Sequence, residues 1–281
     1  MNVLEFTLLV GLGSLAAGFL GALTGLGGGV VIVPLLTLVF KVDLRYAVGA
    51  SLVSVIATSS GAAAAYVKEG YSNIRIGMLL EIATTLGAVG GAFLAAVLPL
   101  PVIAVVFGIV LLGSAYLTSR PHAEHAAAGE RPDPVASRLR LDGAYPTPEG
   151  PRSYHVRRVP LGFGMMFVAG VISGLLGIGS GALKVLAMDQ AMRLPFKVST
   201  TTSNFMIGVT AAASAGVYLG RGYIDPALAM PVMLGVLAGS WLGSRLLTLL
   251  QPRVLRWVFV AVIVALGLQM IYQGFTGGFV K

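Results

Sequence analysis

The stretch GALTGLGGGVVIVP, Gly21–Pro34, lies inside an apolar run that begins near the N-terminus. A run of glycines breaks a helix, because glycine favours no single backbone conformation. A second stretch, SGLLGIGSGALKVL, Ser173–Leu186, repeats the pattern 152 positions later. The two stretches therefore predict a long apolar segment interrupted by non-helical backbone in each half of the chain.

The composition is that of a membrane protein. The 281 residues are 56% hydrophobic and 11% charged, with a mean hydropathy of +0.89. A soluble domain carries about 25% charged residues, and several apolar runs here reach the ~20 residues needed to cross a bilayer. A soluble all-helical protein would have to expose too much apolar surface. We expect an all-α polytopic membrane protein.

Charge and cysteine content exclude several function classes. The chain has no cysteine, which excludes disulfides, thiol catalysis and Cys-ligated metals. Its net charge of +8 comes from basic residues between apolar runs, as the positive-inside rule requires, so no nucleic-acid partner is expected. The start of the chain, MNVLEFTLLVG, lacks a basic region and a cleavage site, and it is interpreted as a retained membrane segment.

Eight apolar segments are divided by one polar segment. We expect an N-terminal membrane repeat at residues 1–117, a cytoplasmic polar loop at 118–159 and a C-terminal membrane repeat at 160–281. The loop contains seven arginines, and its prolines argue against a stable fold of its own. His122 and His125 have a spacing that would suit a metal, but a solvated loop is the favoured interpretation.

The two halves form an internal repeat with an offset of 152 residues. Chance matching of apolar residues cannot explain why glycines, tyrosines and loop cations coincide in one register. Gly87 and Gly91 meet Gly239 and Gly243, as small residues suited to close helix packing. Other matched pairs are Gly25 with Gly177, Gly29 with Gly181, Ser51 with Ser203, and Tyr66 with Tyr218.

The first segment of each half decides the topology. It spans about 35 residues, or about 50 Å as a helix, which is too long for one ordinary crossing. It is either one broken helix, giving parallel halves, or a hairpin that returns to the same side, giving inverted halves. The inverted arrangement is favoured, because outside the cytoplasm it leaves only Lys41, Arg45, Arg221 and Lys281. It places both termini outside the cytoplasm.

In a hairpin, the glycines form a tip near the middle of the bilayer. The backbone N–H groups that open the second arm then make an anion site. Glycines that serve helix packing alone are the alternative. The predicted contacts are Thr24, Gly25, Gly27, Gly28 and Gly29 in the first half, and Gly177, Gly179, Ser180 and Gly181 in the second.

Polar side chains inside the segments complete the candidate site. Lys184 lies within an apolar segment, so it is predicted to attract an anion, with snorkelling to the interface as the alternative. Thr201, Ser203 and Asn204 either line the anion path or, for the hydroxyls, bond to their own helix. Glu81 is a candidate for proton coupling, although pairing with a cation is favoured.

The motif GxLxGxGGGxxxxP, its echo in the second half and the two four-segment halves resemble the TauE/SafE family of sulfite exporter-like anion permeases. The resemblance covers the whole chain except the central loop. It implies transport of sulfite, sulfonates or other small organic anions. The second stretch departs from the motif, because Ser180 replaces a glycine and Leu186 stands opposite Pro34.

The leading hypothesis is a secondary transporter in the cell inner membrane that exports a small sulfur-containing anion by alternating access. Its driving force would be the membrane potential, alone or with a proton. An anion channel and a permease for another organic anion are the alternatives. An enzyme is disfavoured, because all three histidines lie in the loop. No metal or cofactor is expected, and the sequence leaves open whether the chain forms a homo-oligomer.

Overall fold

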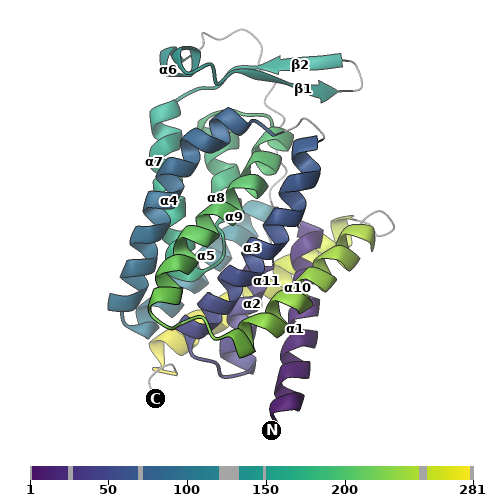
Figure 1. The fold of residues 1–281 in the computed structure, drawn as a ribbon, viewed down its shortest axis with the longest axis vertical. Helices are drawn as coiled ribbons and strands as arrows, with labels where there is room; N and C mark the ends of the chain where they lie inside the picture. Colours follow the sequence, from purple (N-terminus) through teal and green to yellow (C-terminus); the bar gives the residue numbers. More distant parts are fainter. Residues whose placement is uncertain are drawn as a thin grey trace.

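The computed structural model of the protein describes residues 2–24, 28–68, 72–119, 133–147, 150–246 and 252–278. Helices dominate, and a two-stranded sheet interrupts them (Figure 1). In chain order the elements are α1 (Val3–Thr24), α2 (Gly29–Pro34), the π-helix η1 (Leu35–Val39), α3 (Leu44–Lys68), α4 (Ile74–Val97), α5 (Leu100–Ser119), α6 (Pro134–Arg138), β1 (Gly143–Thr147), β2 (Gly150–Tyr154), α7 (Val159–Leu176), α8 (Gly181–Leu186), the π-helix η2 (Ala187–Ala191), α9 (Phe196–Gly220), α10 (Pro226–Leu246) and α11 (Pro252–Phe275).

The predicted all-α polytopic membrane fold is confirmed. Within the described residues, α1, α4, α5, α7 and α10 each contain a stretch long and apolar enough to cross a bilayer. Helices α3 and α9 have 25 residues each and carry more hydroxyl side chains. These two helices pack against each other.

The predicted break is present in the second half, and in the first half α1 and α2 are separate elements on either side of residues 25–27, which lie outside the described residues. Helix α1 ends at Thr24 and α2 begins at Gly29, while α7 ends at Leu176 and α8 begins at Gly181. In the second half, Gly177, Gly179 and Ser180 have φ values of +69°, +70° and +46°. This left-handed backbone cannot continue a helix, and it suits glycine far better than a residue with a Cβ.

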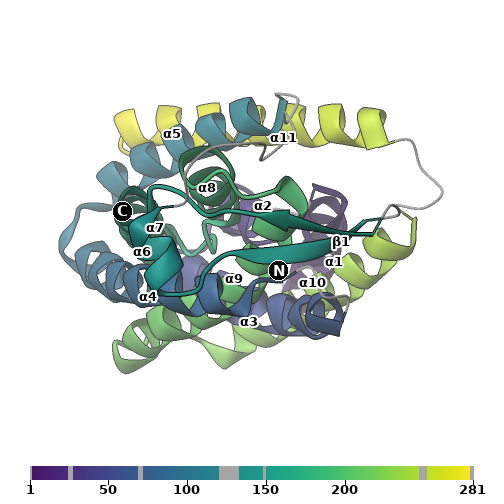
Figure 2. The same cartoon turned by 90° about the horizontal axis from the view of Figure 1, so that it is seen from above.

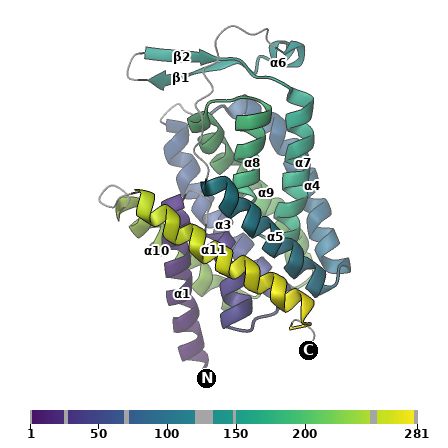
Figure 3. The same cartoon turned by 180° about the vertical axis from the view of Figure 1, so that it is seen from behind.

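The bounds of the elements recur with the offset seen in the sequence. Elements α2, η1 and α3 reappear 152 residues later as α8, η2 and α9. Each π-helix is followed by a basic residue in the left-handed region, Lys41 with φ +56° and Arg193 with φ +54°. The inverted relation between the halves stays a prediction. Both termini lie at the end of the molecule remote from the sheet (Figures 1 and 3).

Helices of the two halves are interleaved. Helix α4 packs on α7 and α10 packs on α1, and both interfaces are close enough to bring backbone to backbone. A Cβ on Gly87 would strike the carbonyl oxygen of Phe167, and one on Gly239 would strike that of Leu15. The expected packing role of Gly87 is therefore confirmed, and its mate 152 residues on does the same. Helices α5 and α11 form a third pair along one side of the molecule (Figures 2 and 3).

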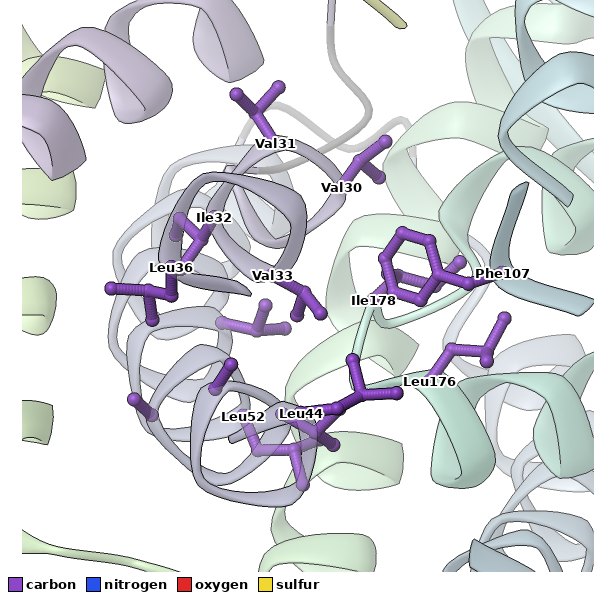
Figure 4. Packing of buried hydrophobic residues seen from close by; sticks show 14 of the residues in the cluster. Val30, Val31, Ile32, Val33, Leu36, Leu44, Leu52, Phe107, Leu176 and Ile178 are labelled. Atoms are coloured by element: carbon purple, nitrogen blue, oxygen red, sulfur yellow. The ribbon is translucent and has the colours of Figure 1, made fainter. Parts of the chain in front are cut away.

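The apolar core gathers around the short helices and the tip of the second half. Ile32 and Val33 of α2 are fully buried, as is Phe107 of α5. Ile178, which lies between the glycines of the second tip, belongs to the same cluster (Figure 4). Because this packing surrounds the second break, the non-helical backbone of residues 177–180 is buried in protein, as it must be at membrane depth.

The expectation that the central loop lacks a stable fold is wrong for residues 133–158. Strands β1 and β2 form an antiparallel hairpin in which Gly143 pairs with Tyr154. Asp133 caps α6 by accepting from Val135 N, at 2.8 Å. The segment contributes Ala136 and Val156 to a buried cluster that also contains Ile76 of α4. The composition concealed this fold, because its stability comes from docking on the membrane helices.

Polar contacts attach the hairpin to the start of α4. Asn73 caps that helix and donates through Nδ2 to the carbonyl oxygen of Leu141, at 2.9 Å, and to the hydroxyl of Tyr154, at 2.8 Å. Burial raises the pKa of the Tyr154 hydroxyl, so this group stays neutral. The hairpin is thus fixed above the end of the bundle where α4 begins (Figure 1).

Candidate anion site

The second glycine tip lies between α3 of the first half and α9 of the second. Ser51 Oγ of α3 donates to the carbonyl oxygen of Gly177, at 2.8 Å. A Cβ built on Gly29 would lie 3.3 Å from the same oxygen. Gly29 of the first stretch therefore lies beside Gly177 of the second.

The close approach explains why glycines stand at these positions. A Cβ on Gly29 would lie 2.8 Å from Val55 Cγ2, and one on Gly179 would lie 2.8 Å from Ile207 Cγ2. Gly177 combines a positive φ with a Cβ position 2.7 Å from Val48 Cγ1. Packing accounts for part of the glycine pattern, since each residue faces protein atoms.

The first tip is described only in part. The side chain of Thr24 and all of Gly25 and Gly27 lie outside the described residues. Gly28 is buried and precedes α2, with its Cβ position 2.9 Å from Val236 Cγ1 of α10.

Lys184 is completely buried in the protein. It lies in α8, and its Nζ donates to Thr210 Oγ1 of α9 at 2.5 Å. The alternative of a lysine that snorkels to the interface is wrong, because no part of the side chain reaches the surface. A cation at such a position requires compensation by charge or by hydrogen bonds.

Glu81 supplies that compensation through a hydroxyl. Thr210 Oγ1 lies 2.7 Å from Glu81 Oε1, and Thr85 Oγ1 donates to the same oxygen at 3.1 Å. Glu81 is 8% exposed, and its Oε2 has no hydrogen-bond partner within the part of the chain that the structure describes. Glu81 is thus linked to Lys184 through the hydroxyl of Thr210.

The polar residues at the start of α9 have divided roles. Thr201 donates to the carbonyl oxygen of Lys197 at 2.9 Å, so it bonds to its own helix. Ser203 donates to the carbonyl oxygen of Gly181 at 3.3 Å and thereby holds the tip. Asn204 is half-buried. Ser180 Oγ is buried at the tip, without a hydrogen bond to any described residue.

Sequence reasoning missed Thr210, which joins the two charged residues. The available signal was its spacing from Ser203, because residues seven apart lie on one helix face. Asp189 of η2 was also missed and is 3% exposed. Thr210 was not conspicuous in the sequence because its segment is rich in hydroxyl residues. Its link to both charged residues is visible only in the folded structure.

The charged pair breaks the repeat. At an offset of 152 residues, Glu81, Lys184 and Thr210 correspond to Met233, Ile32 and Thr58. Ile32 is fully buried in apolar surroundings, so this fold does not require a lysine at the equivalent place. The cost of burying this charged pair is therefore borne in one half only.

This arrangement defines a multi-pass helical membrane protein with polar groups buried between broken helices. The TauE family model, described as sulfite exporter TauE/SafE, matches residues 10–270. The chain belongs to the TauE/SafE family, and it is a membrane transporter rather than an enzyme.

Relatives named as probable membrane transporters cover nearly the whole chain. YunE of Bacillus subtilis (strain 168) is 30% identical over 96% of this chain and 99% of its own length. YdhB of the same strain is 27% identical over 85% of this chain and 88% of its own. A protein of Xylella fastidiosa (strain 9a5c) is 25% identical over 97% of each chain. No solved structure matches the chain significantly.

Proposed function

We propose that the protein is a secondary transporter that exports a small sulfur-containing anion, sulfite or an organosulfonate, across the inner membrane. The observation that carries the proposal is Lys184, a fully buried cation three residues beyond Gly181. A buried ammonium group attracts an oxyanion strongly, because little water competes for either charge. The family description, sulfite exporter, supports the choice of anion.

The anion would lie between Lys184 and the second glycine tip. Ser180 Oγ supports this placement, because it is a buried donor that no described residue occupies. Backbone N–H groups near Gly181 would add donors, and Ser203 would hold the tip in place through its bond to Gly181 O. The first tip, including Thr24, Gly25 and Gly27, would contribute in the same way from the other half.

Alternating access would come from two interleaved bodies. One body would comprise α1, α2, α3 and α10, built around the α1–α10 pair, and the other α7, α8, α9 and α4, built around the α4–α7 pair. The α3–α9 interface joins the bodies, and the second tip lies beside it. An inverted repeat would let the two bodies exchange conformations around a fixed site.

Flux of radiolabelled sulfite into proteoliposomes tests the proposal. We expect saturable flux in the wild type, with sulfate, thiosulfate and taurine as competitors, and a loss of about tenfold or more in Lys184→Ala. Lys197→Ala, which removes an exposed lysine of α9, is the control and should keep full flux. Normal flux in Lys184→Ala would remove Lys184 from the site, and flux that never saturates would favour a channel.

A further inference from the structure

Lys184 cannot serve an incoming anion while Glu81 neutralises it. The two side chains are joined through Thr210, with 2.5 Å from Lys184 Nζ to the hydroxyl oxygen and 2.7 Å from that oxygen to Glu81 Oε1. With both groups ionised, the buried cluster has no net charge. An added anion would leave one negative charge in excess, which is costly away from water.

We propose that Glu81 is the proton-binding residue of the transporter, and that one proton binds in the site with each monovalent anion and is released with it on the other side of the membrane. The proton binds at Glu81 Oε2, the buried oxygen that has no partner among the described residues. The anion then replaces the carboxylate as the counter-ion of Lys184. The cluster is neutral before and after the exchange, since a carboxylate is lost and an anion is gained. This inference rests on the proposed function.

Thr210 is suited to this exchange because its hydroxyl has two acceptors. Besides Glu81 Oε1, the carbonyl oxygen of Met206 lies 2.9 Å from Thr210 Oγ1. The single hydroxyl hydrogen can turn from Glu81 to Met206 when Glu81 becomes neutral. In both positions the oxygen can still accept from Lys184, so the lysine keeps a partner throughout.

Few ionisable side chains lie on the two helices that pack most closely against α4. Helices α7 and α9 pack against α4. Between Val159 and Leu176, α7 has no ionisable side chain. On α9, Lys197 and Tyr218 lie about 20 Å and about 12 Å along the helix from Thr210. Arg75 of α4 is exposed and donates to the carbonyl oxygen of Arg140. Asp189 and Arg193 follow Lys184 on η2 and just beyond it.

The position of the cluster also fits a coupling site. Glu81 comes from the first half, whereas Lys184 and Thr210 come from the second. Thr210 is the fifteenth of the 25 residues of α9, close to the middle of that helix. For a monovalent anion the exchange is electroneutral. The flux would then follow the anion gradient and the pH gradient. Unlike the export driven by the membrane potential that the sequence suggested, it would not respond to that potential.

The experiment compares the wild type with Glu81→Gln, which keeps the shape of a protonated carboxyl group but cannot release a proton. The substrate is a radiolabelled simple alkanesulfonate, which stays ionised near neutral pH, so every proton counted belongs to the protein. Reconstituted vesicles report net flux under a pH gradient and, separately, exchange of labelled for unlabelled sulfonate. Glu5→Gln, in an exposed acid of α1, is the matched control.

With one proton per anion, we expect a pH difference of one unit to change the sulfonate accumulation ratio in the wild type and in Glu5→Gln by about tenfold, with proton movement in the same direction as the anion. In Glu81→Gln, exchange of labelled for unlabelled sulfonate should continue, whereas net flux should not depend on the pH gradient. Net flux in Glu81→Gln that still follows the gradient would overturn the inference and leave the transporter assignment intact. Absence of sulfonate and sulfite flux from the wild type would overturn the proposed function, and the inference with it.

A binding measurement covers the case in which Glu81→Gln fails to fold. In weakly buffered detergent solution, sulfonate binding to the wild type should take up about one proton per site. Binding without proton uptake would contradict the proposal whatever the variant does.

Discussion

At the scale of single residues, two charged side chains from different halves of the chain are buried together. Lys184 and Glu81 are each more than nine-tenths buried, and Thr210 stands between them. Such a pair adds little to stability, because desolvation offsets most of the attraction. Removing one partner destabilises the protein strongly, since the remaining charge is then buried without compensation.

This asymmetry predicts the outcome of a double-mutant cycle. Lys184→Met and Glu81→Gln should each destabilise the protein, by up to about 3–5 kcal/mol, whereas the double variant should lose less than the sum. Thermal unfolding in detergent, followed by circular dichroism, measures the difference. Glu5→Gln with Lys197→Met, two exposed sites, is the control pair and should be additive. Additive losses for Lys184 and Glu81 would mean that the two residues do not interact.

At the scale of helices, glycines fix how closely the interleaved pairs approach. A Cβ on Gly174 would strike the carbonyl oxygen of Ala88, and one on Gly91 would strike that of Val171. Backbone atoms cannot turn aside as a side chain can, so the helices would have to separate. Gly90, one position from Gly91, has no atom within 4 Å of its Cβ position.

Alanine substitution therefore separates the two kinds of glycine. Gly174→Ala should lower the midpoint of thermal unfolding, by a free energy of about 1–3 kcal/mol for overpacking. Gly90→Ala should leave it unchanged or raise it, because alanine favours the helix. Both variants are measured side by side in detergent. Equal effects would show that α4 and α7 are not packed as closely as described.

At the scale of the whole molecule, the sheet and both termini mark opposite ends. Strands β1 and β2 lie at one end, while the N- and C-termini lie at the other (Figures 1 and 3). Because the arginine-rich segment that contains the sheet is expected to be cytoplasmic, the termini should face the opposite side of the membrane.

The absence of cysteine makes this topology easy to test. Single variants Asn2→Cys, Thr276→Cys and Arg152→Cys each introduce one thiol at an exposed position. In intact cells a membrane-impermeant maleimide should label the first two variants and spare Arg152→Cys, which should react only after the membrane is opened. Labelling of the two termini from different sides would contradict the inverted arrangement.

The sequence by itself determined the features that depend on neighbouring residues. The length of each apolar run determines whether it can cross a bilayer, and the clustered glycines determine where a helix breaks. For this reason the predicted break at the second glycine stretch is present, and the offset of 152 recurs in the bounds of α3 and α9. Lys184 was also conspicuous, since a lone cation in an apolar segment is costly wherever it points.

Only the tertiary structure decided which residues meet. Thr210 joins Lys184 to Glu81 across 26 and 129 positions of sequence, and no local pattern records such a contact. The fold of the central segment was missed for the same reason, because Tyr154 and Val156 are buried against helices far along the chain. Packing between distant segments is a property of the folded chain, so it determines partners that composition and periodicity leave open.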